Sequence, residues 1–166
     1  MKVNVQTWVV GLYFVFMLIK SISGIRGTIG GSVGECLTPP DIVRFATGYG
    51  AWILAKMEVK KSKIPTVVLG RDARLSGRMV SDLISSTLNA LGINVVDLGL
   101  STTPTVELAV PELSANGGII ITASHNPKEW NALKLLDGRG EFLSASEGEQ
   151  VLKLSDSQIQ YAEVDD

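Results

Sequence analysis

The chain has 166 residues, of which 45% are hydrophobic and 19% are charged, and its formal net charge is -2. This composition fits one globular domain with a substantial core and excludes a disordered, collagen-like or repetitive chain. The small net charge gives no general attraction to nucleic acid or to an anionic membrane, so we expect neither as a partner. The single cysteine, Cys36, cannot form an internal disulfide, which favours a reducing, cytoplasmic location.

An apolar run, residues 8–19, lies near the start of the sequence with one lysine on either side. It is shorter than the about 20 apolar residues that a membrane-spanning helix needs. Three interpretations stay open: a secretion signal or anchor, an extra element packed on the domain, and an extension upstream of a natural start at Met17. We favour the third, because residues 17–22 already form a complete first strand. We therefore divide the chain into an N-terminal extension, residues 1–16, and a folded domain, residues 17–166.

Hydrophobic periodicity and turn residues predict alternating strands and helices. The predicted strands are residues 17–22, 65–70, 93–99, 117–122 and 132–136, and helices begin near residues 39, 77, 104 and 145. Short connections between these elements favour an α/β fold, a three-layer α/β/α sandwich around a mostly parallel mixed sheet. The glycine-rich segment after the first strand and the strand at 132–136 are the candidates for antiparallel pairing.

Each predicted helix has a start signal. Thr38, Ser76 and Thr103 are placed to cap three helices, and Ser144 with Glu147 forms a capping box for the fourth. Apolar residues then recur at helical spacing, which predicts one buried stripe per helix. The stripes include Ile42, Phe45, Tyr49 and Ile53, then Val80, Ile84 and Leu88, and then Val106, Ala109, Val110 and Leu113.

The stretch from Gly117 to Pro127 carries the strongest functional signal. Its apolar first half breaks abruptly into Thr122-Ala123-Ser124-His125-Asn126-Pro127, which predicts a buried strand that ends in a tight loop. Open α/β sheets bind their ligands at the carboxyl ends of the strands. Lys134 follows ten positions after Ser124. We expect this loop to be the reactive site.

Two other polar segments could contribute. Arg26 lies between paired glycines, where its guanidinium could contact a phosphate; a glycine-rich hairpin with a solvated arginine is the alternative. The segment 70–77 follows another predicted strand and places Asp72 between Arg71 and Arg74. For Asp72 we favour a structural ion pair over direct catalysis.

Three kinds of chemistry can be compared for the serine loop. A serine hydrolase is disfavoured, because there is no Gly-x-Ser-x-Gly elbow and the only histidine, His125, is adjacent to Ser124 in the sequence. P-loop and Rossmann glycine patterns do not occur, which disfavours those modes of nucleotide binding. A phosphorylated serine that passes its phosphoryl group to a substrate hydroxyl suits the loop. The alternative is that Ser124 and Asn126 are only turn residues.

Three segments together resemble the α-D-phosphohexomutases, the phosphoglucomutase, phosphomannomutase and phosphoglucosamine mutase family. They are Ser23-Gly24-Ile25-Arg26-Gly27, Gly70-Arg71-Asp72-Ala73-Arg74-Leu75-Ser76-Gly77 and Thr122-Ala123-Ser124-His125-Asn126-Pro127, in the family's order. The resemblance runs from about residue 17 to the C-terminus and implies domain I of a four-domain enzyme. It implies an intramolecular phosphotransferase of the isomerase class, which exchanges the 1-phosphate and 6-phosphate of a hexose or hexosamine through a bisphosphate intermediate.

The resemblance also implies roles for single residues. Ser124 would be phosphorylated in the resting enzyme, Lys134 would act as a general acid or base, and Arg26 would steady the phosphate. His125 and Asn126 would shape the loop. The other residues that it places at the substrate or the phosphate loop are Thr122, Ala123, Asn131 and Arg71. The implied cofactors are Mg²⁺, bound partly through the phosphate on Ser124, and a hexose 1,6-bisphosphate as activator.

Two departures from the family pattern matter. Asn131-Ala132 stands where the family often has Asn-Gly, and the family's aspartate-rich metal loop, sugar-recognition loop and C-terminal phosphate loop do not occur in the sequence. We therefore expect an excised domain that cannot complete turnover alone. Its partners would be a sugar phosphate and the remaining domains of a parent chain, and faces left bare by excision could form an oligomer. The alternative is a non-catalytic domain whose serine loop only holds an anion such as a sugar phosphate.

Overall fold

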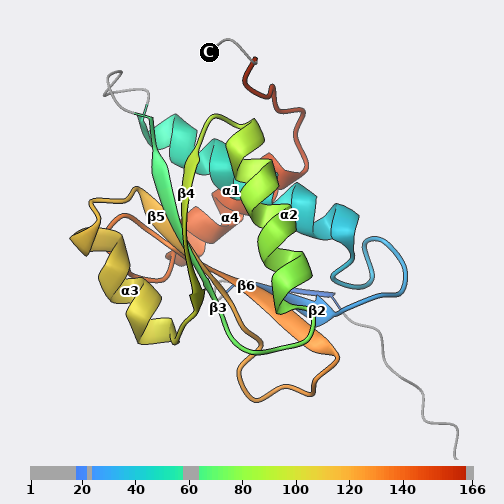
Figure 1. Ribbon diagram of the computed structural model, residues 1–166. Helices are drawn as coiled ribbons and strands as arrows, with labels where there is room; N and C mark the ends of the chain where they lie inside the picture. The colour runs from blue at the N-terminus through green and yellow to red at the C-terminus, as the bar shows by residue number, and fades with distance from the viewer. Residues whose placement is uncertain (1–17, 22–23, 58–63, 164–166) are drawn as a thin grey trace, which may run out of the picture.

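The protein contains a six-stranded sheet and four helices (Figure 1). Its computed structural model describes residues 18–21, 24–57 and 64–163, so the expected extension at residues 1–16 lies outside the described residues. The strands are β1 (Leu18–Ser21), β2 (Gly24–Thr28), β3 (Thr66–Arg71), β4 (Asn94–Leu100), β5 (Gly117–Ile121) and β6 (Trp130–Leu136). The helices are α1 (Pro39–Met57), α2 (Gly77–Ala90), α3 (Thr103–Glu112) and α4 (Ala145–Ser155).

The strands lie in the order β1-β2-β6-β5-β3-β4. Strand β3 pairs in parallel with β4 and β5, whereas β6 pairs antiparallel with β5 and β2, and β1 pairs antiparallel with β2. Four of the six strands (β2, β3, β4 and β5) therefore run in one direction. The α/β fold with a mixed sheet is confirmed, as is the antiparallel pairing of the two candidate segments. Adjacent parallel pairs are confined to β4, β3 and β5, which are joined by helical crossovers.

The larger part of the core lies between the sheet and helices α1, α2 and α4, and a smaller part lies under α3 on the opposite face (Figure 1). Strand β5 is buried on both faces: Ile119 and Ile121 belong to the larger cluster, and Ile120 belongs to the smaller one. This explains why its sequence is a continuous apolar run without alternation. The predicted apolar stripes on α1 and α2 are buried. They contribute Ile42, Phe45, Tyr49, Ile53, Val80, Ile84 and Leu88 to the larger cluster.

Helix α1 begins directly after Thr38, as predicted, and the capping box at the start of α4 is confirmed. In that box the Ser144 hydroxyl accepts a hydrogen bond from the Glu147 N–H, and the Glu147 carboxylate accepts one from the Ser144 N–H. The Glu147 carboxylate also accepts a 2.7 Å hydrogen bond from Lys56. The bonds from Lys56 and Ser144, in that order of size, lower the pKa of Glu147 to about 2.

Three details of the predicted helices are wrong. Helix α3 is capped by Thr102, not Thr103, because the Thr102 hydroxyl accepts the hydrogen bond from the Thr105 N–H. The Ser76 hydroxyl does not cap α2; it accepts a 2.9 Å hydrogen bond from the side-chain amide of Asn131 instead. Leu113 does not face inward, because α3 ends one residue earlier, and 49% of Leu113 is exposed.

Helix α3 covers only part of its face of the sheet, packing on β3 and β5. The strand register places Lys134 opposite Ile120, and Arg26 opposite Ala132. Because side chains directly opposite each other lie on one face of a sheet, Lys134, Ala132 and Arg26 lie on the α3 face, beyond the strands that this helix covers. The described helices thus leave part of the sheet surface next to the end of β5 uncovered. Among the described residues, no helix is long and apolar enough to cross a membrane.

Candidate active site

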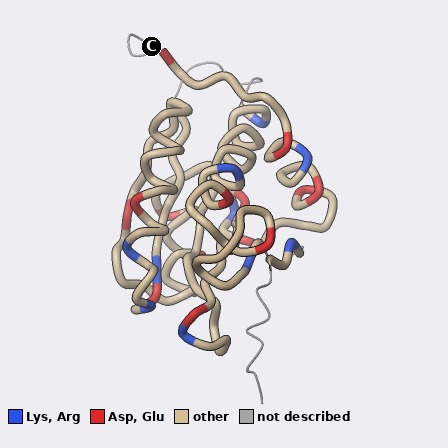
Figure 2. Tube along the Cα trace, turned by 90° about the vertical axis from the view of Figure 1, so that its right-hand side faces the viewer, with Lys and Arg blue, Asp and Glu red and all other residues tan. Residues whose placement is uncertain are grey.

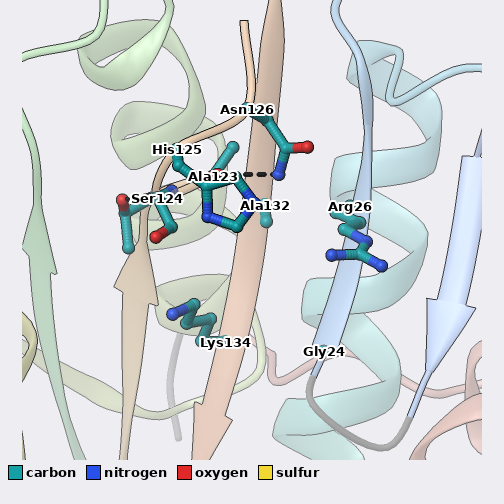
Figure 3. A pocket seen from close by; sticks show the side chains of 9 residues that line it. Gly24, Arg26, Ala123, Ser124, His125, Asn126, Ala132 and Lys134 are labelled. Carbon is teal, nitrogen blue, oxygen red and sulfur yellow. Dashed lines mark hydrogen bonds between the residues drawn. The ribbon is translucent and has the colours of Figure 1, made fainter.

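A pocket of about 220 Å³ lies on this part of the sheet, where the loop after β5 meets β6 and β2 (Figure 3). It is lined by Gly24, Arg26, Thr122, Ala123, Ser124, His125, Asn126, Ala132 and Lys134. Seven of the nine predicted site residues are in this set, although one of them, Arg26, is far from the other six in the sequence. The other two, Asn131 and Arg71, do not line the pocket.

The serine loop is a tight turn. Both the backbone N–H and the side-chain amide of Asn126 donate hydrogen bonds to the Ala123 carbonyl oxygen, at 3.0 and 2.8 Å, and Figure 3 marks the second of these. Within the turn Ser124 has a φ of 54°, in the left-handed region that non-glycine residues rarely adopt. Ser124 is exposed, and its hydroxyl has no hydrogen-bond partner among the described residues. The loop therefore presents an unbonded serine hydroxyl at the pocket.

Two cationic side chains accompany the serine. Arg26 on β2 and Lys134 on β6 flank the open sheet surface (Figure 3). No carboxylate lines the pocket, and neither residue has an ion pair within the described ranges. The Lys134 ammonium lies 5.8 Å from the ring centroid of Phe142. Acidic and basic residues are otherwise interspersed along the chain (Figure 2), so the positive character of the pocket is local and favours an anionic ligand.

The loop after β3 supports the serine loop, a role that sequence reasoning missed. The predicted ion pair is confirmed: Nε of Arg74 lies 3.2 Å from a carboxylate oxygen of Asp72. The rest of the Arg74 guanidinium reaches across to the serine loop. It donates hydrogen bonds of 2.7 to 2.9 Å to four carbonyl oxygens there, those of Ser124, Asn126, Pro127 and Trp130. The parallel pairing of β3 with β5 could have indicated this contact, because it places the two loops side by side.

Asn131 and Arg71 connect neighbouring segments of the scaffold. Besides its bond to Ser76, the buried Asn131 accepts a 2.8 Å hydrogen bond from the N–H of Ala132. Arg71 donates from its guanidinium to the Asp72 carbonyl oxygen at 3.3 Å. Their roles at the substrate stay predictions.

Magnesium prefers oxygen ligands, and carboxylates are the usual protein donors. The described part of the chain holds no cluster of three or more His, Cys, Asp or Glu residues that could bind a metal ion. The side chains of the described residues therefore offer no carboxylate cluster for Mg²⁺. Phosphate oxygens on Ser124 are the ligands that the resemblance assigns to this part of the chain.

The fold and the pocket define a class of protein: an α/β/α domain in which a serine at the end of a strand shares an open pocket with two cations. A family profile described as phosphoglucomutase/phosphomannomutase, alpha/beta/alpha domain I, matches residues 18–162. The chain belongs to the phosphoglucomutase/phosphomannomutase family and corresponds to its domain I. The resemblance inferred from the three sequence segments is confirmed.

Similar proteins are consistent with this assignment. A phosphoglucomutase/phosphomannomutase from Thermococcus kodakarensis is 40% identical over 116 residues, which are 69% of this chain and 25% of that protein. A phosphoglucosamine mutase from Alkaliphilus metalliredigens is 38% identical over 77% of this chain and 27% of its own length. The crystal structure of a putative phosphomannomutase from Thermus thermophilus superposes with a TM-score of 0.72 at 29% identity, covering 83% of this chain and 30% of that one. The chain thus spans about a quarter of the length of these curated relatives.

Proposed function

We propose that this chain is the phosphoserine-bearing domain of a phosphohexomutase, which interconverts the 1-phosphate and 6-phosphate of a hexose or hexosamine. The observation that carries the proposal is the unbonded Ser124 hydroxyl, held in one pocket with Lys134 and Arg26 and without a carboxylate. A free serine is a weak nucleophile, but a phosphorylated one is a phosphoryl donor that needs only positioning and charge stabilisation. The pocket offers both.

In the first step, the phosphoryl group on Ser124 passes to a free hydroxyl of the sugar monophosphate. The bond between phosphorus and the serine oxygen breaks, and a bond to the sugar oxygen forms, which gives a sugar bisphosphate. Lys134 carries the proton from the sugar hydroxyl to the serine oxygen, as general base and then as general acid. Arg26 stabilises the charge on the transferring group with its guanidinium.

In the second step, the bisphosphate reverses its orientation in the site and returns its other phosphoryl group to Ser124. This restores the phosphorylated enzyme and leaves the sugar with its phosphate at the other position. A hexose 1,6-bisphosphate would activate the enzyme by loading an unphosphorylated Ser124 in the same way. Bound Mg²⁺ would neutralise charge on the phosphoryl oxygens. The remaining domains of a parent chain would hold the rest of the sugar, and we expect the isolated chain to be inactive and the parent enzyme to be cytoplasmic.

A second candidate function is a domain that binds a sugar phosphate without reacting. The two cations that lack ion-pair partners in the described ranges favour it as well, because they would attract a phosphate whether or not Ser124 reacts. The two candidates differ only in whether the serine oxygen exchanges a phosphoryl group.

Peptide mass spectrometry of the complete native protein separates them. We expect phosphate on Ser124, lost on addition of a hexose monophosphate, and no mutase activity in the Ser124→Ala variant. Ser157→Ala is the matched control, because Ser157 is an exposed serine at the end of α4 whose hydroxyl donates only to the Lys153 carbonyl oxygen. An unmodified Ser124 that a sugar bisphosphate with Mg²⁺ cannot load would leave only the binding function.

A further inference from the structure

A closed ring of hydrogen bonds surrounds the backbone of Ser124 and joins the loops after β3 and β5. The Ser124 N–H donates to the Thr122 hydroxyl at 3.0 Å, and that hydroxyl donates to the Asp72 carboxylate at 2.6 Å. The same carboxylate oxygen accepts from Nε of Arg74 at 3.2 Å. The ring closes where Nη2 of Arg74 donates to the Ser124 carbonyl oxygen at 2.8 Å.

The ring binds both polar groups of the Ser124 backbone and leaves the hydroxyl free. Ser124 needs such support, because a left-handed conformation costs a non-glycine residue about 1 kcal/mol and persists only where its surroundings fix it. A relaxed backbone at this position would point the serine oxygen in another direction. The ring and the free hydroxyl are therefore two parts of one arrangement.

Arg74 cannot take part in the reaction itself. A guanidinium has five N–H donors, and Arg74 uses all five: one on Asp72 and four on the carbonyl oxygens of the serine loop. Its side chain is only 12% exposed, and it does not line the pocket. Because no donor is left for a substrate, any effect of Arg74 on the reaction must pass through the position of the serine loop.

We propose that Arg74, Asp72 and Thr122 form a positioning device that holds Ser124 in its left-handed conformation and so aims its oxygen into the pocket. The effect on reaction rate rests on the proposed function, whereas the effect on the loop backbone does not. Lysine cannot replace Arg74, because its three donors on a single nitrogen cannot span four carbonyl oxygens and a carboxylate.

The test compares Arg74→Lys and Thr122→Val with the wild type in the complete native protein. The control is Arg78→Lys, because Arg78 is an exposed arginine on α2 whose ion pair is with Asp82. Hydrogen exchange of the Ser124 amide should accelerate about tenfold in both ring variants and stay unchanged in the control. In the mutase assay, kcat should fall about 100-fold while KM stays within about threefold, since the group that reacts is misplaced and substrate binding is kept.

Chemical rescue provides a further readout that general damage to the fold would not give. Guanidinium at a non-denaturing concentration should restore the kcat of Arg74→Ala to at least about a tenth of the wild-type value. It should not raise the kcat of Thr122→Val, which keeps its arginine. Thr122→Val changes little volume, so it keeps the test informative if the Arg74 variants do not fold.

The outcomes separate this inference from the proposed function. Unchanged amide exchange in Thr122→Val and in a folded Arg74→Lys would overturn the ring. Faster exchange with an unchanged kcat, in a protein whose Ser124 carries phosphate, would overturn the proposal that the ring aims the serine oxygen. Phosphate on Ser124 would leave the mutase function standing in either case. Faster exchange in a protein whose Ser124 never carries phosphate would instead support the ring as a device that holds the loop and reject the mutase function.

Discussion

The two ends of strand β5 use their residues in opposite ways. At the amino end, Gly117 and Gly118 are buried, and a Cβ atom on Gly117 would lie 2.2 Å from the hydroxyl oxygen of Tyr49. Glycine is needed there for space. At the carboxyl end, Ser124 occupies a left-handed position that glycine would adopt more easily. A side chain is thus absent where it would disturb packing and present where it strains the backbone, as expected if the proposed function needs the Ser124 hydroxyl.

The polar groups at the two ends differ in the same way. The buried Tyr49 hydroxyl donates toward the carbonyl oxygens of Leu136 and Gly118, at 2.7 and 3.2 Å, and so ties α1 to the β5–β6 pair. Burial raises the pKa of Tyr49 well above its ordinary value, which keeps the hydroxyl a neutral donor. At the carboxyl end the ring satisfies the Ser124 backbone and leaves its side chain unbonded. The amino end therefore serves stability, and on the proposed function the carboxyl end serves chemistry.

The largest effect is expected from Ser124→Gly. Loss of the hydroxyl should abolish phosphoryl transfer, by at least about 10⁴-fold, because the group that forms the covalent intermediate is gone. Stability should not fall, and it could rise by up to about 1 kcal/mol, since glycine removes the left-handed strain. Activity assays and urea unfolding measure the two effects.

Ser114→Gly is the matched control for this variant. Ser114 is the other described non-glycine residue with a positive φ, 51°, and it lies beyond the end of α3, outside the pocket. It should show the same change in unfolding free energy with full activity. Loss of stability in Ser124→Gly but not in Ser114→Gly would show that the Ser124 side chain stabilises the fold, as the residues at the amino end of β5 do.

The next largest effect is expected from Lys134→Ala. Removing a general acid or base costs about 100-fold to 10⁴-fold in kcat, and stability should change little because Lys134 is only half-buried. Lys153→Ala on the exposed face of α4 is the control and should keep full activity. A less than threefold change in kcat for Lys134→Ala would remove Lys134 from the mechanism and leave the serine without its proton carrier.

At the amino end, Gly117→Ala should destabilise the protein by about 3 kcal/mol, because the new methyl group overlaps the Tyr49 hydroxyl and the Leu136 carbonyl oxygen, which would lie 2.8 Å away. Tyr49→Phe alone should cost about 1 kcal/mol, for the lost hydrogen bond. The double variant should cost less than the sum, since phenylalanine lacks the oxygen that meets the methyl group. Urea unfolding measures all three, and strict additivity would mean that Gly117 does not make room for Tyr49.

The smallest effect is expected from Glu147→Gln. Glu147 lies at neither end of β5, and it serves as a reference for an ordinary helix-capping site. Hydrogen bonds lower the pKa of Glu147 in the folded state from 4.5 to about 2. Because the pKa of Glu147 is lower in the folded state, this residue stabilises the fold fully when the pH is above its pKa in the unfolded chain. The contribution is lost as the pH falls from 4.5 toward 2. The variant should lose about 1 kcal/mol at neutral pH and less below pH 4.5. A loss of unfolding free energy that does not depend on pH would contradict a stabilising role for the negative charge of Glu147.

Much of the fold follows from local sequence patterns. The continuous apolar run of β5 and the helical stripe of α1 are buried as predicted, because periodicity reports directly on which faces avoid water. The errors occur where a distant partner decides. The Ser76 hydroxyl fails to cap α2 because it bonds to Asn131, 55 positions away, and a local rule for caps cannot register that partner.

The candidate site likewise has a part that local sequence patterns predict and a part that depends on distant partners. Ser124 and its loop are recognisable in sequence, because a strand that ends in small and polar residues forms a local motif. The pocket also needs Arg26 and Lys134, which antiparallel pairing of β2 and β6 brings to the serine loop. Arg74 could be predicted only as the partner of Asp72, two positions away. Its four carbonyl partners lie 50 to 56 positions further along the chain and depend on the adjacency of β3 and β5.

On the proposed function, the oxygen of Ser124 carries the phosphoryl group. The most direct measurement loads the complete native protein with radioactive phosphate on Ser124, adds unlabelled hexose monophosphate, and follows the label in a single turnover. We expect the label to leave Ser124 and to appear first in the sugar bisphosphate and then in the product monophosphate. Interconversion of the sugar phosphates while the label stays on Ser124, or while Ser124 accepts no label, would contradict it.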